Sequence, residues 1–187
     1  MAIGGSNNKG STTSNSATSG SPTSVNAPTE SVPAVTSAPV AGLTAKNPAP
    51  LGAQVTVAKG WNVKVNSAEL DADDTMAALN QFNTPSQGKQ YVLVNVSITN
   101  SSSVPGSMLF NLKLSLLPPS GVAIDSLSCF AQALSEIDVS AQLQPGATET
   151  GNLCFEASAS DAASAVLLGE PQFTMDSVKD QRFFAIK

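Results

Sequence analysis

The sequence contains no histidine, and this absence excludes several kinds of site at once. Imidazole is the general base of Ser-His-Asp and Cys-His catalytic sites and a ligand in many zinc sites. Basic residues are also few, because nine Lys and Arg stand against 14 Asp and Glu, for a formal net charge of −5. Such a chain lacks the clustered cations that neutralise phosphates. We therefore expect no enzyme activity, no cofactor and no nucleic-acid partner.

Long apolar runs are missing too, and none approaches the roughly 18 residues that span a membrane. The first fifty residues contain none of the aromatic side chains and neither cysteine, and more than half of them are Ser, Thr, Pro or Gly. A segment of this kind cannot bury enough apolar surface to offset a backbone entropy cost of about 1–2 kcal/mol per residue. We therefore predict a disordered linker over residues 1–50 and a folded domain over residues 51–187.

The start of the chain indicates how this linker is attached. Residues 4–8 read Gly-Gly-Ser-Asn-Asn, which is similar to the sequence that follows the lipid-modified cysteine of bacterial lipoproteins. We interpret Met1-Ala2-Ile3 as standing in place of a signal peptide and its anchor cysteine. A native, unanchored N-terminus is the alternative. On the first interpretation, the protein meets the membrane only through a lipid anchor that this sequence lacks.

From residue 51 onward, apolar and polar residues alternate with period two, which is typical of β-strands. The clearest strand is 89–100, in which Val92, Val94, Val96 and Ile98 form one face. Turn residues separate the strands. We expect seven to nine strands in an all-β, immunoglobulin-like antiparallel β-sandwich. The predicted strands are 54–58, 61–66, 89–100, 110–116, 122–125, near 129–134, 147–157, 165–168 and 182–186.

A long connection over residues 71–88 interrupts this pattern. It contains a predicted helix over 74–82, with Asp73 or Asp74 as its N-cap. Met76, Leu79 and Phe82 are its hydrophobic residues, and long loops on sandwiches are often functional. We predict that these three residues form the contact surface. The alternative is a lid that packs over the end of the sandwich.

Cys129 and Cys154 are the only cysteines. In an exported protein, two cysteines predict a disulfide. A bridge of this length stabilises a fold by roughly 3 kcal/mol in the chain-entropy model. A buried thiol pair in a cytosolic protein, or one reactive cysteine, is the rival interpretation. Since the neighbouring side chains are apolar or neutral, nothing nearby would activate a thiolate, and a structural role is predicted.

Two further motifs carry hydrogen-bonding or charged groups. Glu69, Asp71, Asp73 and Asp74 form an acidic cluster of the kind that calcium prefers, although its spacing lacks the glycine and final glutamate of an EF-hand. We treat it as a weak metal candidate beside a solvated acidic loop. Residues 86–89 match the Ser-x-x-Lys spacing of serine acylases. Because Pro85 and Gly88 flank the serine and a strand follows, we predict a turn there.

Several segments of the folded part resemble one known domain. They are Gly60-Trp61-Asn62-Val63, the strand entry 88–92, the strand 94–100, Leu143-Gln144-Pro145-Gly146 and 150–156. Together they are similar to the uncharacterised immunoglobulin-like domain of secreted lipoproteins in Gram-positive bacteria, especially actinobacteria. That domain is sometimes mislabelled as a telomeric-repeat-binding-factor domain, and its fold is similar to that of a secreted mycobacterial Ig-like antigen.

The resemblance implies export, an extracellular location at the cell membrane through a lipid anchor, and no catalytic residues. We therefore expect a monomeric, non-enzymatic binding module that recognises a protein or a cell-wall component. One alternative is an envelope protein that binds a small ligand or calcium through the acidic cluster. A structural spacer is another.

Overall fold

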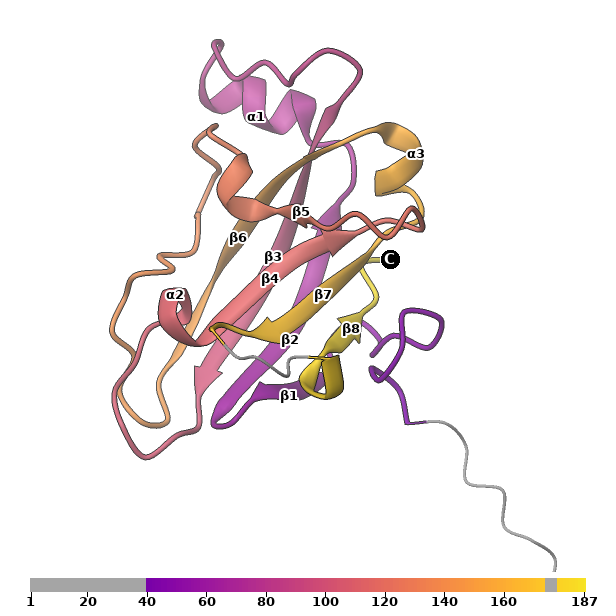
Figure 1. Cartoon of the computed structure of the whole chain (residues 1–187). Coiled ribbons are helices and arrows are strands. Elements are labelled where there is room, and N and C mark those ends of the chain that lie inside the picture. Colours follow the sequence, from indigo (N-terminus) through magenta and orange to yellow (C-terminus); the bar gives the residue numbers. More distant parts are fainter. Residues whose placement is uncertain (1–39, 174–177) are drawn as a thin grey trace, which may run out of the picture. The chain divides into compact units, whose positions relative to one another are not determined.

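Two antiparallel sheets pack face to face in the described part of this computed structural model, residues 40–173 and 178–187 (Figure 1). The first sheet has the strand order β1-β2-β3-β6, and the second has the order β5-β4-β7-β8. The predicted all-β antiparallel sandwich is therefore confirmed. The elements in chain order are β1 (Gln54–Ala58), β2 (Trp61–Glu69), α1 (Asp73–Leu79), β3 (Gln90–Asn100), α2 (Met108–Asn111), β4 (Leu112–Leu117), β5 (Ile124–Asp125), η1 (Ser126–Ser128), β6 (Thr148–Ala157), α3 (Ala159–Ala162), β7 (Val166–Pro171), η2 (Val178–Asp180) and β8 (Arg182–Phe184).

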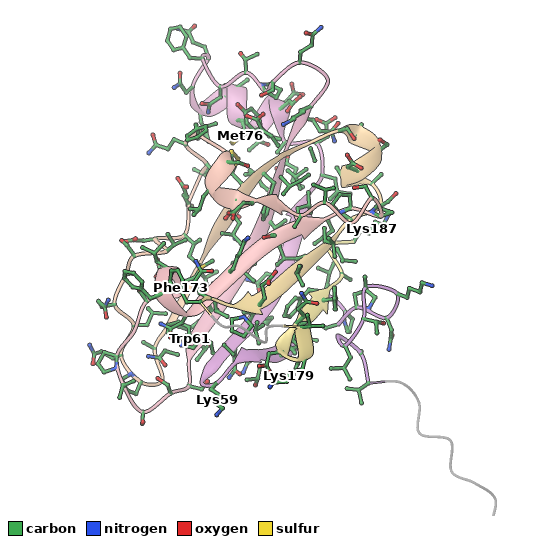
Figure 2. The ribbon with its side chains drawn as sticks, viewed as in Figure 1. Lys59, Trp61, Met76, Phe173, Lys179 and Lys187 are labelled. Atoms are coloured by element: carbon green, nitrogen blue, oxygen red, sulfur yellow. A yellow bond between two sulfur atoms is a disulfide. The ribbon has the colours of Figure 1, made fainter. Side chains whose placement is uncertain are left out.

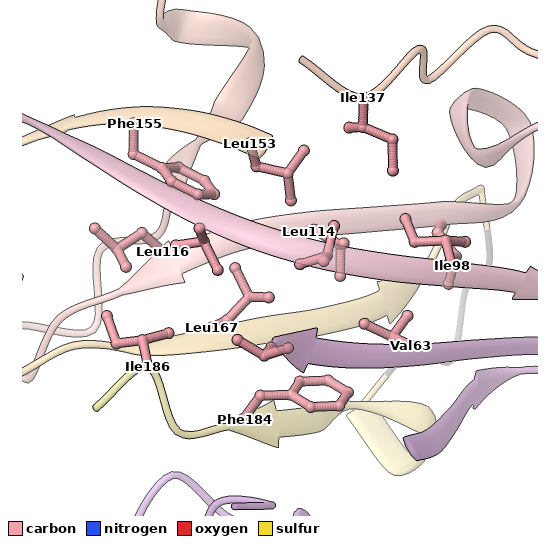
Figure 3. Close-up of a cluster of buried hydrophobic side chains, with 14 of the residues drawn as sticks. Val63, Ile98, Leu114, Leu116, Ile137, Leu153, Phe155, Leu167, Phe184 and Ile186 are labelled. Atoms are coloured by element: carbon pink, nitrogen blue, oxygen red, sulfur yellow. The ribbon is translucent and has the colours of Figure 1, made fainter. Parts of the chain in front are cut away.

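The core lies between the two sheets and follows the alternation in the sequence. The predicted core face of β3 is buried along its whole length. On the facing sheet, β4, β7 and β8 each contribute large apolar side chains that are fully buried. Figure 3 shows how residues of both sheets meet in one cluster, among them Val63, Ile98, Leu114, Leu116, Leu153, Phe155, Leu167 and Phe184.

The strand predicted over 110–116 begins two residues late. Residues Met108–Asn111 form the single helical turn α2, and β4 follows it. The Asn111 side chain donates a hydrogen bond of 2.7 Å to the carbonyl of Ser107. This local bond competes with strand pairing, as asparagine side chains often do. Phe110 is consequently 63 % exposed and does not lie on the core face.

The prediction of a strand near 129–134 is wrong. The chain there is irregular and follows the short helix η1, Ser126–Ser128. The Asp125 carboxylate caps η1 by accepting the Leu127 amide at 3.0 Å. Beyond it the chain is held by side-chain contacts instead of a strand ladder.

Helix α1 spans Asp73–Leu79, close to the predicted range 74–82, but neither aspartate is its N-cap. Ala72 takes that position, and no side chain caps the helix. The Asp73 carboxylate instead accepts the Tyr91 amide at 2.8 Å, which ties the start of α1 to the start of β3. The helix ends because Asn80 has an extended backbone.

The folded unit starts before the predicted boundary at residue 51. The chain divides into Met1–Ser37 and Ala38–Lys187, and the disorder predicted for residues 1–39 lies outside the described residues. Residues 42–49 cover the free edge of β8. The Ala49 amide donates to Phe183 at 2.8 Å, and the Phe183 amide donates to Gly42 at 2.9 Å. Ala49 itself is buried.

The free edge of β6 is covered in a similar way by residues 135–138. The Ile137 amide donates to Asn152 at 3.1 Å, and the Asn152 amide donates to Ser135 at 2.8 Å. Gly151 makes this approach possible, since a Cβ there would lie 2.7 Å from the Ile137 Cα. Among residues 40–173 and 178–187, no helix is long and apolar enough to cross a membrane.

Candidate functional site

A second apolar cluster lies on the outer face of the first sheet, where β3 begins and β6 ends. It joins α1, the two strands and the irregular chain after η1, and its buried members are Ala72, Met76, Tyr91, Leu93, Ala133 and Cys154. The predicted disulfide between Cys129 and Cys154 is present, with Cα atoms 5.7 Å apart. We call this end, made of residues 72–89 and 129–135, the tip.

The three residues predicted to form a contact surface point in different directions. Met76 is fully buried and packs in the second cluster on the side of α1 that faces the sheet (Figure 2). Leu79 is 43 % exposed and Phe82 is 81 % exposed. Only Leu79 and Phe82 are therefore available to a partner.

The structure adds an exposed aromatic residue that the sequence analysis missed. Phe130 is 95 % exposed, directly beside the disulfide. The two segments of the tip are joined by Asn83, whose side chain donates to the carbonyls of Met76 at 3.0 Å and Gln132 at 3.4 Å. We call Leu79, Phe82 and Phe130 the tip patch. A strand over 129–134 was expected, so nothing in the sequence marked Phe130 as an exposed loop residue.

A hollow of about 320 Å³ lies between these two segments. Leu79 and Asn80 line one side, and residues 132–135 line the other. The tip patch is therefore uneven, with projecting side chains next to a recess. A surface of this shape can interlock with a partner.

The acidic cluster of the sequence does not converge on a point. Glu69 accepts the Thr75 hydroxyl at 2.7 Å, whereas Asp73 accepts the Tyr91 amide. In the part of the chain that the structure describes, no three Asp, Glu, Cys or His side chains are grouped to hold a metal ion. Glu69, Asp71, Asp73 and Asp74 thus lie in the acidic loop as separate side chains.

Negative charge is nevertheless concentrated in and around the tip. Segments 69–91, 126–136 and 154–157 carry six carboxylates and one lysine. The remaining described residues carry six carboxylates and seven Lys or Arg, so they are nearly balanced. The tip and the chain segments next to it therefore carry most of the excess negative charge, and the rest of the domain is close to neutral.

The pKa of Tyr91 reflects its burial and this negatively charged environment. Burial in the second cluster raises the pKa of its hydroxyl above the usual 10.0, and the negative charges of Glu156 and Asp73 raise it further. The phenol therefore stays neutral well above physiological pH. Tyr91 accordingly acts as a packing residue beneath the tip.

The Ser-x-x-Lys motif lies in a turn, as predicted. The Ser86 hydroxyl donates to the Glu156 carboxylate at 2.6 Å, and the Lys89 amide donates to the Ser86 carbonyl at 2.9 Å. No helix places Lys89 one turn from Ser86, which is the arrangement that serine acylases use. Ser86 instead fixes the loop to β6.

Two more exposed aromatic residues lie toward the opposite end of the sandwich. They are Phe110 at 63 % exposure and Phe173 at 81 % (Figure 2). A hollow of about 280 Å³ beside Phe110 is lined by both Lys59 and Asp180. This end therefore lacks the charge bias of the tip.

The described residues thus form an antiparallel sandwich with exposed apolar side chains at its tip. Residues 51–180 match the family described as "Domain of unknown function (DUF4352)". The chain belongs to this family. None of the curated proteins compared with it is similar.

Several solved structures resemble the chain. A conserved hypothetical protein from Bacillus anthracis is 12% identical, with a TM-score of 0.44, over 73% of this chain and 95% of that one. A Bacillus subtilis protein described as a "putative lipoprotein (ycdA)" is 15% identical, with a TM-score of 0.47, over 70% of this chain and 37% of that one. An uncharacterized beta-sandwich protein from Clostridium difficile is 11% identical, with a TM-score of 0.43, over 75% of this chain and 95% of that one.

Proposed function

We propose that this protein is a non-enzymatic binding module of the bacterial cell envelope that recognises another protein through its tip patch. The observation that carries the proposal is the exposure of Leu79, Phe82 and Phe130 on one stapled end of the sandwich. Exposed apolar groups that gather in one place usually mark an interaction surface. Aromatic residues also supply much of the binding energy at such surfaces.

The tip is held in shape before any partner arrives. The disulfide fixes one segment to β6, and the Asn83 side chain joins that segment to the chain after α1. A surface that is already ordered loses less conformational entropy on binding. This supports recognition by a preformed site.

The negative charge in and around the tip favours a partner with a positively charged surface. An apolar patch in a negatively charged region favours a protein whose apolar surface is rimmed by Lys and Arg, and the charges speed their association. The same charges repel an anionic lipid surface. They also oppose self-association through the tip, which supports the expected monomer.

The disulfide supports a location outside the cytoplasm. Structural disulfides persist in oxidising compartments, which for a bacterium means outside the cytoplasm. The lipid anchor, the stalk and the relation to actinobacterial lipoproteins rest on the sequence resemblance. They belong to this proposal.

Photo-crosslinking on intact cells tests the proposal. A photoreactive amino acid replaces Phe82 in the full chain, and a matched variant carries it at Phe110, which is exposed but distant. We expect one discrete protein adduct from position 82 that disappears when Phe130→Ser is added. Equal adducts from both positions, or none from position 82, would point to a spacer.

A further inference from the structure

The outer face of the first sheet is polar and almost free of charge. By strand register, β2, β3 and β6 place Asn, Ser and Thr side chains next to one another below the tip. Lys64 is the only charged residue among them. The members are Asn62, Lys64, Asn66, Asn95, Ser97, Thr99, Thr148, Thr150 and Asn152.

A β-bulge in β2 adds side chains to this face. The register shifts between Val65 and Ser67, so Asn66 is an extra residue opposite β3. The Asn66 side chain reaches Asn95 and Ser97 across the sheet, each at 2.9 Å. Ser67, which pairs with Asn95, lies beside it. Bulges commonly redirect side chains in this way next to functional sites.

Three asparagines form a directed row of hydrogen bonds across the sheet. Asn66 donates to the side chain of Asn95 at 2.9 Å, and Asn95 donates to that of Asn152 at 2.8 Å. Asn152 in turn donates to the Leu134 carbonyl. Each side-chain amide has two N–H donors and an oxygen with two lone pairs, so the bonds within this row leave some N–H groups and lone pairs free to bind a ligand. The side chains are thus ordered in advance and still able to bind.

This row ends in a hollow of about 200 Å³ beneath the tip. Its polar lining comes from Ser67, Glu69, Thr75, Asn95 and Asn152, and Leu134 forms an apolar wall that is 53 % exposed. The Thr75 hydroxyl donates a hydrogen bond to Oε1 of Glu69. Within the described residues no side chain or amide donates to Oε2, so this oxygen can accept from a ligand. The hollow thus combines an apolar surface with several separate hydrogen-bonding groups.

We infer that this hollow and the polar face below it bind an uncharged carbohydrate chain. A sugar ring presents C–H groups to an apolar wall and hydroxyls to amides and a carboxylate, which are the groups found here. Protein interfaces need an apolar centre, which the polar face lacks. Nucleic acids and acidic polymers need cations, and Glu69 repels them. A neutral, hydroxyl-rich ligand matches both the hollow and the face.

This site is separate from the tip patch, so it is tested with different residues. The probe is an array of neutral and acidic glycans that includes purified bacterial wall polysaccharides, incubated with the labelled full chain. Ser67→Arg fills the hollow, and Glu69→Gln removes one charge with little change in shape. Ser103→Arg, at an exposed position in the loop after β3, is the matched control.

We expect at least one neutral glycan to bind, with Ser67→Arg weakening it by about tenfold or more, as one lost hydrogen-bonded contact does. Glu69→Gln should weaken it less, and Ser103→Arg should leave it unchanged. In NMR titrations the shifts should cluster at Asn66, Asn95 and Asn152. Binding of acidic glycans alone, equal loss in both arginine variants, or no bound glycan would overturn the inference. The Phe130→Ser variant should bind the glycan normally, which separates this result from the proposed function.

Discussion

Removing the disulfide is the perturbation with the most calculable effect. The two cysteines are separated by 25 positions, and in the chain-entropy model closing a loop of that size stabilises the fold by about 3.5 kcal/mol. Cys154 is also buried in the second cluster, so trimming it to alanine costs about 1 kcal/mol more in lost packing. Together these losses approach the lower end of the 5–15 kcal/mol that is typical of whole domains.

The assay is urea unfolding of the Cys129→Ser/Cys154→Ala double variant against the unaltered chain. We expect the free energy of unfolding to fall by about 4–5 kcal/mol. A reducing agent should bring the unaltered chain close to the variant, and it should leave the variant unaffected. This control separates the crosslink from the side-chain changes.

Hydrogen exchange locates the effect. The amides of residues 129–135 should lose protection first, because without the crosslink that segment keeps only scattered contacts. These are the packing of Ala133, the hydrogen bond from the Asn83 side chain, and the hydrogen bonds from Asn152 to the Leu134 and Ser135 carbonyls. The amides of the core strands should keep most of their protection from exchange. A stability loss below about 1 kcal/mol would refute this account. Two free thiols in denatured, unreduced protein would refute the disulfide itself.

Three further predictions concern the rest of the domain. Gly151→Ala should destabilise the fold by about 1–3 kcal/mol, since the new methyl group meets the Ile137 backbone at 2.7 Å; urea unfolding and exchange at the Ile137 amide report it. Phe184→Ala should cost about 3–5 kcal/mol in the same assay, while Phe110→Ala at an exposed site should stay within about 0.5 kcal/mol of the unaltered chain. The raised pKa of Tyr91 means that the folded state binds this proton more tightly than the unfolded state does. Its contribution is therefore complete below pH 10 and is lost as the pH rises through the folded pKa. Tyr91→Phe should flatten that alkaline decline in unfolding titrations, and an unchanged slope would contradict the assignment.

The sequence by itself determined the sandwich and its inner faces. Alternation in β3 and in the first five residues of β2 fixes which side chains point inward, because successive residues of a strand face opposite sides. The turn residues divided the chain into strands because Gly and Pro restrict or free the backbone locally. The pairing of the two cysteines also followed from their number alone. All of these features depend on near neighbours or on simple counting.

The tip and the carbohydrate site depended on contacts between distant residues. The sequence predicted the bridge from Cys129, but it did not show that the bridge and the Asn83 side chain hold an irregular segment in which Phe130 is exposed. The asparagine row joins residues 66, 95 and 152, which strand order and one bulge bring together. Local sequence sets backbone preferences and the face of each residue. Only the packing of the sheets decides which polar and apolar groups from different strands share one surface.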